Sequence, residues 1–258
     1  MSEHTWRVLL TRPAAECQAL AAFLAEHNIY SSALPLLAIR PLELLPEHHA
    51  CLANFARYRA VIVVSKPAAR LGVAHLRKIG AKLSCAQWFC VGAATAKVLK
   101  ELGVEATFPQ SADDSEALLA MPEFARILAE PNACVLILHA DEGRAWLSEQ
   151  LVAKGLKVDF LALYQRYLPA YAAGTLAAQV KSHALNALVV SSGQGLSNLL
   201  EVAGPDWAWL ANKTLFVPSP RVAELARLAG AKQVVDCRGA SAAALLSALN
   251  NHHPALDS

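Results

Sequence analysis

The chain has 258 residues, of which 55% are hydrophobic and 17% are charged, and its formal net charge is +2. Such an apolar chain can bury enough surface to offset the entropy lost on folding, which excludes intrinsic disorder. With 23 Lys and Arg against 21 Asp and Glu, a nucleic-acid binder that depends on a basic face is not expected.

The sequence pattern contains no targeting signal, membrane span or metal-ligand motif. The longest wholly apolar runs, such as residues 60–64, have the length of a strand and fall far short of the roughly 20 residues that cross a bilayer. No basic segment followed by an apolar one opens the chain, so no signal peptide is expected. The six cysteines include no Cys-x-x-Cys pair, and no histidines stand at ligand spacing. We predict reduced thiols, a cytoplasmic location and no bound metal.

In chain order, the first half alternates short apolar runs with helical patterns. Residues 7–11 are a short apolar run, and Pro13 then suits the first turn of a helix that ends near Asn28. Further strands are predicted over residues 31–39, 60–65, 88–91 and 105–108, and further helices over 47–58, 67–80 and 93–102.

The second half repeats the first. Val8-Leu9-Leu10 has a counterpart in Val135-Leu136-Ile137, at an offset of 127 positions. Val63-Val64-Ser65 matches Val189-Val190-Ser191, and Val91-Gly92 matches Val217-Pro218, both at an offset of 126. We therefore predict two copies of one unit, over roughly residues 6–110 and 133–237. The second copy has strands near 134–138, 157–164, 186–191, 214–217 and 233–237.

This alternation of strands with helices of 10–15 residues indicates parallel sheets that are covered on both faces. The predicted fold class is α/β, with two similar doubly wound parallel-sheet domains. Pro-containing segments at 38–41 and 169–172 have the character of linkers, and we take them as the hinges. One domain then comprises 1–37 plus 173–258, and the other comprises 42–168.

Short hydroxyl side chains, glycines and arginines follow the predicted strands in both copies. Ligands of parallel sheets bind beyond the carboxyl ends of the strands, and helix N-termini there favour anions. Any one of these hydroxyls is more simply explained as an N-cap, so the prediction rests on their recurrence. The residues concerned are Thr11, Arg12, Ser65, Gly92, Thr95, Ser191, Ser192 and Ser219.

Tyr164 closes a predicted apolar strand and is followed by Arg166. A phenol at a strand end can donate a proton into a cleft. It can equally be an aromatic side chain packed at a domain edge, and both interpretations stay open.

Several other classes of site are disfavoured. Gly193-Gln194-Gly195 lacks the third glycine of a dinucleotide fingerprint, and there is neither a P-loop lysine pattern nor a Gly-x-Ser-x-Gly elbow. A nucleotide-dependent enzyme is therefore not expected.

Taken together, the repeated halves and a set of ordered motifs resemble the uroporphyrinogen-III synthase family over nearly the whole chain. The motifs are residues 8–13, Val91-Gly92-x-x-Thr95-Ala96-x-x-Leu99-x-x-x-Gly103, Gly143-Arg144, Tyr164-x-Arg166 and Val190-Ser191-Ser192.

The resemblance implies two domains joined by a two-stranded linker. It also implies a cyclising hydro-lyase of porphyrin (tetrapyrrole, haem) biosynthesis. It would convert linear hydroxymethylbilane to uroporphyrinogen III, with loss of water and inversion of ring D through a spiro intermediate. The resemblance implies no cofactor and no metal. Tyr164 is the expected catalytic residue, assisting loss of water, and the eight residues named above would bind the polycarboxylate substrate. We expect a cytoplasmic monomer with no nucleic-acid or membrane partner, and a transient contact with hydroxymethylbilane synthase stays open.

Two loops depart from the family pattern. Pro218-Ser219-Pro220-Arg221 stands where the family often has Gly-x-x-Thr-Ala, and Ser65-Lys66-Pro67 replaces a Ser-x-Asn type of loop. Arg221 and Lys66 are therefore candidate substitutes for an anion contact. The alternative function is a non-catalytic two-domain module that binds a small anionic ligand in the interdomain cleft.

Overall fold

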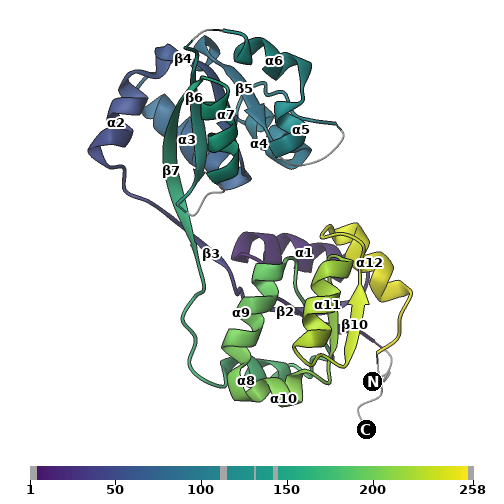
Figure 1. Ribbon diagram of the computed structural model, residues 1–258. Coiled ribbons are helices and arrows are strands. Elements are labelled where there is room, and N and C mark those ends of the chain that lie inside the picture. The colour runs from purple at the N-terminus through teal and green to yellow at the C-terminus, as the bar shows by residue number, and fades with distance from the viewer. Residues whose placement is uncertain (1–4, 111–114, 131, 142–144, 255–258) are drawn as a thin grey trace. The chain divides into compact units, whose positions relative to one another are not determined.

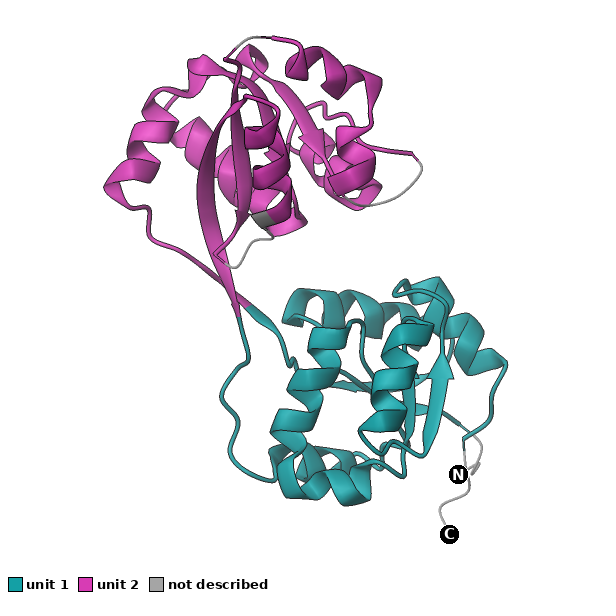
Figure 2. Ribbon diagram, in the orientation of Figure 1, with its two compact units in different colours: residues 1–38, 167–258 teal, residues 39–166 magenta. Residues whose placement is uncertain are grey.

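The computed structural model describes residues 5–110, 115–130, 132–141 and 145–254. The chain divides into two compact units, each built around a sheet of its own (Figures 1 and 2). Unit 1 comprises Met1–Ala38 and Tyr167–Ser258, and unit 2 comprises Ile39–Arg166. The predicted α/β class with parallel sheets is confirmed.

Unit 1 is a parallel sheet with helices on both faces. The strand order is β10-β9-β8-β1-β2, with β1 at Arg7–Leu10, β2 at Tyr30–Ala33, β8 at Ala187–Val189, β9 at Thr214–Val217 and β10 at Gln233–Asp236. Helices α1 (Ala14–Glu26) and α12 (Ala242–Asn250) pack on one face. Helices α8 (Thr175–Ser182), α9 (Gly193–Ala203) and α11 (Pro220–Leu228) pack on the other. The short helix α10 (Trp207–Leu210) follows a 3-10 turn at Gly204–Asp206.

Unit 2 has the same layered plan. Its strand order is β3-β7-β6-β4-β5, with β3 at Ala38–Pro41, β4 at Tyr58–Val63, β5 at Gln87–Cys90, β6 at Cys134–Ala140 and β7 at Lys157–Tyr167. Helices α2 (Pro46–Ala53), α3 (Lys66–Lys78) and α4 (Ala93–Glu101) lie on one face, with 3-10 turns at Phe55–Arg57 and Leu83–Cys85. Helices α5 (Ser115–Leu119), α6 (Pro122–Leu128) and α7 (Ala145–Ala153) lie on the other.

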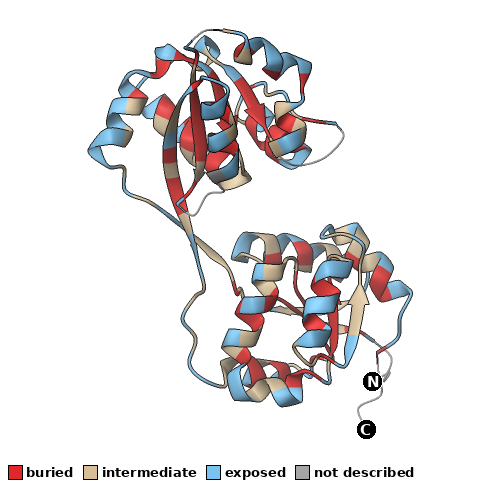
Figure 3. Cartoon of the chain, in the orientation of Figure 1, coloured by how far each residue is buried: buried red, intermediate tan, exposed pale blue. Residues whose placement is uncertain are grey.

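Burial on both faces explains the continuous apolar runs of the strands. In β1, Val8 and Leu10 face the core under α1 and α12, whereas Leu9 faces the core under α9 and α11, and all three are fully buried. Figure 3 shows the same pattern in each unit, with buried strands at the centre and exposed positions on the outer sides of the helices.

One offset relates most strand pairings of the two sheets. Val8 pairs with Ala187 in unit 1, and Val135 pairs with Ala60 in unit 2, so both partners are 127 positions from their counterparts. The pairings of β8 with β9 and of β4 with β5 follow the same offset. The predicted matches at 126 are therefore wrong by one position, and the structural counterpart of Ser65 is Ser192 rather than Ser191.

The copies exchange their first strands. Strands β1 and β2 from the first copy join β8, β9 and β10 from the second. Strands β6 and β7 from the second copy join β4 and β5 from the first. Each unit therefore contains segments from both copies.

Three predicted elements differ from the structure. The single strand expected over 31–39 is two strands, β2 and β3, because Pro35 cannot donate a ladder hydrogen bond and the chain passes there from one sheet toward the other. The expected strand 105–108 is reduced to an isolated bridge between Thr107 and Phe89. The helix expected over 47–58 ends at Ala53, and a 3-10 turn leads into β4.

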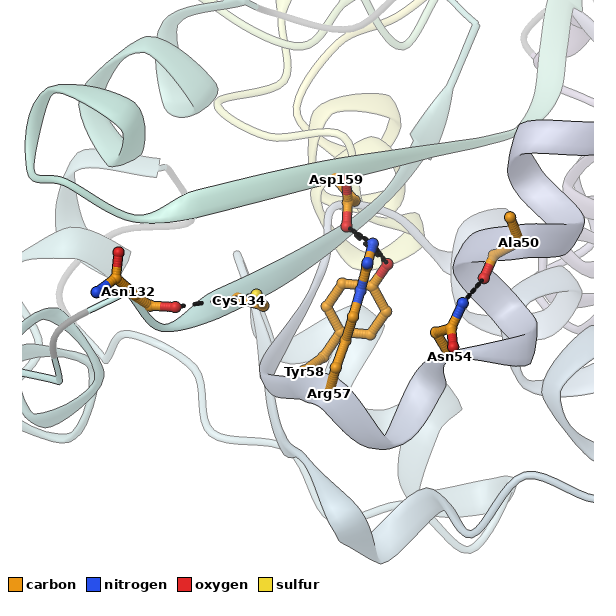
Figure 4. A network of polar contacts seen from close by, with 7 residues as sticks. All are labelled: Ala50, Asn54, Arg57, Tyr58, Asn132, Cys134 and Asp159. Atoms are coloured by element: carbon orange, nitrogen blue, oxygen red, sulfur yellow. Dashed lines mark hydrogen bonds and ion pairs between the residues drawn. The ribbon is translucent and has the colours of Figure 1, made fainter.

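A polar network closes the amino-terminal end of the sheet in unit 2 (Figure 4). The Tyr58 hydroxyl donates to Asp159 Oδ2 at 2.8 Å, and Arg57 donates to the same hydroxyl at 3.0 Å. Arg57 also forms an ion pair with Asp159. Burial is the largest cause that raises the pKa of Tyr58, so the phenol stays protonated and acts as a donor.

In the described residues, no helix has the length and apolar character needed to cross a membrane.

Candidate functional site

Four helices begin with the same backbone geometry at the carboxyl ends of their strands. Ser65, Gly92, Ser192 and Ser219 are the N-caps of α3, α4, α9 and α11, and all four are extended, with φ between −168° and −161°. At the 127-residue offset Ser65 corresponds to Ser192, and Gly92 corresponds to Ser219.

The three serines cap their helices as the simpler interpretation predicts. Ser65 Oγ accepts from the N–H of Ala68 at 3.3 Å, and Ser192 Oγ accepts from the N–H of Gly195 at 3.0 Å. Ser219 Oγ accepts from Val222 at 3.5 Å. Capping satisfies one donor in each first turn, and the remaining first-turn N–H groups keep the positive end of the helix dipole available to an anion.

Two arginines lie near helix starts in unit 1, Arg12 near the start of α12 and Arg221 near the start of α9. Arg12 follows β1, and its Nη2 donates to the carbonyl of Ala240. Its Nε is buried and has no hydrogen-bond partner among the described residues. The Arg221 guanidinium lies at the start of α9, since a Cβ added to Gly193 would be 3.6 Å from Arg221 Nη2. Two cations therefore accompany the helix N-termini of this unit.

The two predicted threonines are buried, and so is Gly92. Thr11 is 3% exposed, and its hydroxyl donates to the carbonyl of Val189 at 2.7 Å. Thr95 is 6% exposed in the first turn of α4. By contrast, Ser65, Gly193 and both Ser191 and Ser192 are half-buried.

Tyr164 lies inside β7 and is fully buried in the core under α3. Its hydroxyl oxygen is 2.9 Å from Ser65 Oγ and accepts from Arg166 Nη2 at 3.2 Å. Arg166 is exposed, and Ser65 is half-buried. The structure thus brings together the predicted catalytic tyrosine, one predicted binding serine and an arginine from the same motif.

A β-bulge gives Tyr164 this orientation. His139 pairs with Ala162, and Ala140 pairs with Tyr164, so Leu163 is an extra residue in β7. If β7 continued past Leu163 without a bulge, the alternation of side chains would turn Tyr164 to the opposite face of the sheet. Leu163 and Tyr164 instead both enter the core under α3.

His139 occupies the position in unit 2 that Arg12 occupies in unit 1, again at the offset of 127. Both of its ring nitrogens are buried without a hydrogen-bond partner among the described residues. Burial lowers the pKa of His139, and the nearby charge of Asp141 opposes that shift. Sequence reasoning did not select this residue, although applying the repeat offset to Arg12 would have found it.

The remaining predictions concern the Gly143-Arg144 motif and metal binding. Gly143 and Arg144 lie outside the described residues. Within the described ranges, no three His, Cys, Asp or Glu side chains are grouped so that they could hold a metal ion.

A sequence model of the family described as "Uroporphyrinogen-III synthase HemD" matches residues 18–247. The chain belongs to the uroporphyrinogen-III synthase family. It is 32% identical to the uroporphyrinogen-III synthase of Salmonella typhimurium over 247 residues, which cover 94% of this chain and 99% of that protein. It is 29% identical to the enzyme of Escherichia coli over the same shares of the two chains.

Solved structures of this family share the fold. A mutant uroporphyrinogen III synthase from the extremely thermophilic bacterium Thermus thermophilus superposes with a TM-score of 0.61 at 18% identity, covering 96% of this chain and 100% of the other. The synthetase from Helicobacter pylori 26695 gives a TM-score of 0.60 at 19% identity, with the same coverage. At these identities the likeness concerns the fold.

Proposed function

We propose that this chain cyclises linear hydroxymethylbilane to uroporphyrinogen III. The observation that carries the proposal is membership of the uroporphyrinogen-III synthase family, matched over residues 18–247. The reaction belongs to tetrapyrrole and haem biosynthesis. Its finer class is that of a hydro-lyase, because the substrate loses water as the ring closes.

The chemistry has a defined sequence. Water leaves the hydroxymethyl group of ring A, and ring D attacks the resulting azafulvene at its substituted carbon. The spiro intermediate then fragments and recloses with ring D inverted. Closure without an enzyme gives the I isomer, so the protein has to fix the substrate conformation as well as assist the loss of water.

The strand-end loops suit a substrate that carries carboxylates. Helix N-termini offer N–H groups and a positive dipole end, and Arg12 and Arg221 add two cations in unit 1. We assign carboxylate contacts to Arg12, Gly92, Thr95, Ser191, Ser192, Ser219 and Arg221, and we assign Ser65 a substrate contact beside Tyr164. Thr11 is assigned a supporting role, because its hydroxyl proton is already donated to Val189.

Tyr164 is assigned to the loss of water, and its contacts with Ser65 and Arg166 support that role. We keep monomeric state and cytoplasmic location as predictions. Size-exclusion chromatography of the purified chain and fractionation of the producing cells test them.

Isomer analysis tests the function. Hydroxymethylbilane is generated by its own synthase, the protein is added, and the oxidised products are separated into uroporphyrins I and III. We expect isomer III to dominate. Isomer I alone, from folded protein, would overturn the proposal and favour the non-catalytic module that binds a small anion.

A further inference from the structure

The burial of Tyr164 conflicts with direct proton donation to a ligand. The side chain is 0% exposed, so its hydroxyl proton can leave only through a neighbouring group. Among the described residues, two side chains form hydrogen bonds with the hydroxyl oxygen, namely Ser65 through Oγ and Arg166 through Nη2. A guanidinium donates hydrogen bonds and accepts none, so of these two the serine is the one that can receive the phenol proton.

The hydrogen bonds around Ser65 leave one direction for its own proton. Oγ accepts from the N–H of Ala68 and lies 2.9 Å from the Tyr164 hydroxyl. When Tyr164 donates to Oγ, both acceptor positions of the serine are filled and its proton points elsewhere. Ser65 is half-buried, and it stands at the carboxyl end of β4 beside the start of α3. Its hydroxyl is thus the accessible end of a two-hydroxyl chain.

We propose that Ser65 hands the proton to the leaving hydroxyl of the substrate and that Tyr164 replaces it. The inference rests on the proposed function and deepens it. As the C–O bond breaks, its electron pair stays with the oxygen, which takes the Ser65 proton and departs as water. Ser65 takes the Tyr164 proton, leaving a phenolate that faces the Arg166 guanidinium. The proton that the substrate releases when the macrocycle closes returns through Ser65 to the phenolate.

Capping alone does not account for this arrangement. Ser192 and Ser219 also cap helices at strand ends, yet among the described residues neither has a tyrosine hydroxyl as a partner. The bulge at Leu163 brings Tyr164 to Ser65 specifically. Arg166 is then a positioning residue, since it acts on the substrate only through the Tyr164 oxygen.

Four variants test the relay in single-turnover assays: Ser65→Ala, Ser65→Thr, Tyr164→Phe and the double variant Ser65→Ala/Tyr164→Phe. We expect kcat to fall about 100-fold in Ser65→Ala and in Tyr164→Phe, the scale of a general-acid contribution. Ser65→Thr keeps both the cap and the hydroxyl and should restore kcat. The double variant should be no slower than either single variant, because the residues act in series.

A cap control separates chemistry from folding. Ser241 caps α12 by accepting from Ala244 at 3.1 Å, so Ser241→Ala removes a cap of the same kind. It should lower the melting temperature as Ser65→Ala does and leave kcat unchanged. Kinetics in mixtures of light and heavy water give a second readout. A plot of the wild-type rate against the fraction of heavy water should be curved, because two protons move together. The same plot should be linear for Ser65→Ala.

Arg166→Gln completes the test. It should lower kcat in the wild-type background and have no further effect on Tyr164→Phe. The relay is overturned if the double variant shows the product of the two single losses, or if Ser65→Ala changes KM alone. Failure of the proposed function is a different result, since the wild-type protein itself would then give no isomer III.

Discussion

Ser65 and Ser192 stand 127 positions apart in the chain and cap α3 and α9 with nearly identical backbone angles. The φ and ψ values are −165° and 160° for Ser65, and −164° and 166° for Ser192. The same local design therefore serves both units, while the surroundings differ. Ser65 contacts a buried phenol, whereas the start of α9 lies beside Arg221. The same type of helix start therefore has a phenol as its neighbour in unit 2 and a cation as its neighbour in unit 1.

Arg221→Ala should weaken substrate binding. Losing one charge-assisted contact with a carboxylate costs about 1.5 to 3 kcal/mol, so we expect KM to rise at least tenfold with kcat nearly unchanged. Arg227→Ala is the matched control, because Arg227 lies in the last turn of the same helix. Equal KM values for the two variants would contradict the assignment of Arg221.

Gly72→Ala should destabilise unit 2. A Cβ at this position of α3 would overlap Leu138 Cδ1 and lie 3.3 Å from Leu163 Cδ1, and both leucines are fully buried. Overpacking costs about 1 to 3 kcal/mol, and the gain in helix propensity offsets about 1 kcal/mol of it. Urea unfolding measures the difference. Leu138→Val removes the closest atom, so adding it to Gly72→Ala should recover part of the loss.

His139 should make stability decline toward acid pH. Burial lowers its pKa below the unfolded value of 6.5, so below about pH 6.5 the unfolded chain binds the proton more readily. Stability is then present above pH 6.5 and is lost as the pH falls toward the folded pKa. The charge of Asp141 lessens this effect, and that of His48 increases it. His139→Gln should flatten the dependence of the urea midpoint on pH between 7.5 and 5. An unchanged slope would refute the assignment of this pH dependence to His139.

Tyr58→Phe should cost stability and spare activity. The hydroxyl links Arg57 and Asp159 at the amino-terminal end of the sheet in unit 2, whereas Ser65 lies at the carboxyl end. We expect a loss of about 1.5 to 3 kcal/mol, the scale of a hydrogen bond to a charged group, while the ion pair between Arg57 and Asp159 persists. Denaturant unfolding gives the loss. A fall in kcat of the folded variant would show that this network reaches the candidate site.

Thiol titration at pH 8 should separate the cysteines by environment. Burial is the main cause that raises the pKa of Cys17 and of Cys237 to about 11, so both remain protonated and slow to react. Cys85 is exposed and should react first with a disulfide reagent. Cys85→Ser should remove the fast phase, and all six thiols should react in denaturant. A fast phase that persists in Cys85→Ser would contradict this order.

Most strands and the repeat could be predicted because buried parallel strands have a strong apolar signature, as in residues 60–64. The exact register of the repeat could not be predicted from the sequence. Matching Ser65 with Ser192 instead of Ser191 leaves the alignment of apolar runs almost unchanged. Hydrogen-bond pairing alone fixes that position.

Most of the candidate loops could also be predicted, because hydroxyls and glycines after strands are local features. The burial of Tyr164 was not accessible in this way. It depends on a bulge in β7, where Leu163 has no partner in the neighbouring strand β6. The paired residues of β6 lie more than 20 positions earlier in the chain. Nothing in the composition of β7 marks that bulge, so the contact with Ser65 emerges only from the folded sheet.

The exchange of first strands sets an order for folding on the ribosome. Unit 2 is one continuous segment, residues 39–166, and can assemble while the chain is still being made. Strand β1 lies between β2 and β8, and its neighbour Thr11 donates to Val189, 178 positions later. At about 5 to 20 residues per second, the nascent β1 waits roughly 10 to 35 seconds for that partner. One side of its backbone is unpaired during that interval, and such an unpaired strand edge exposes the nascent chain to aggregation.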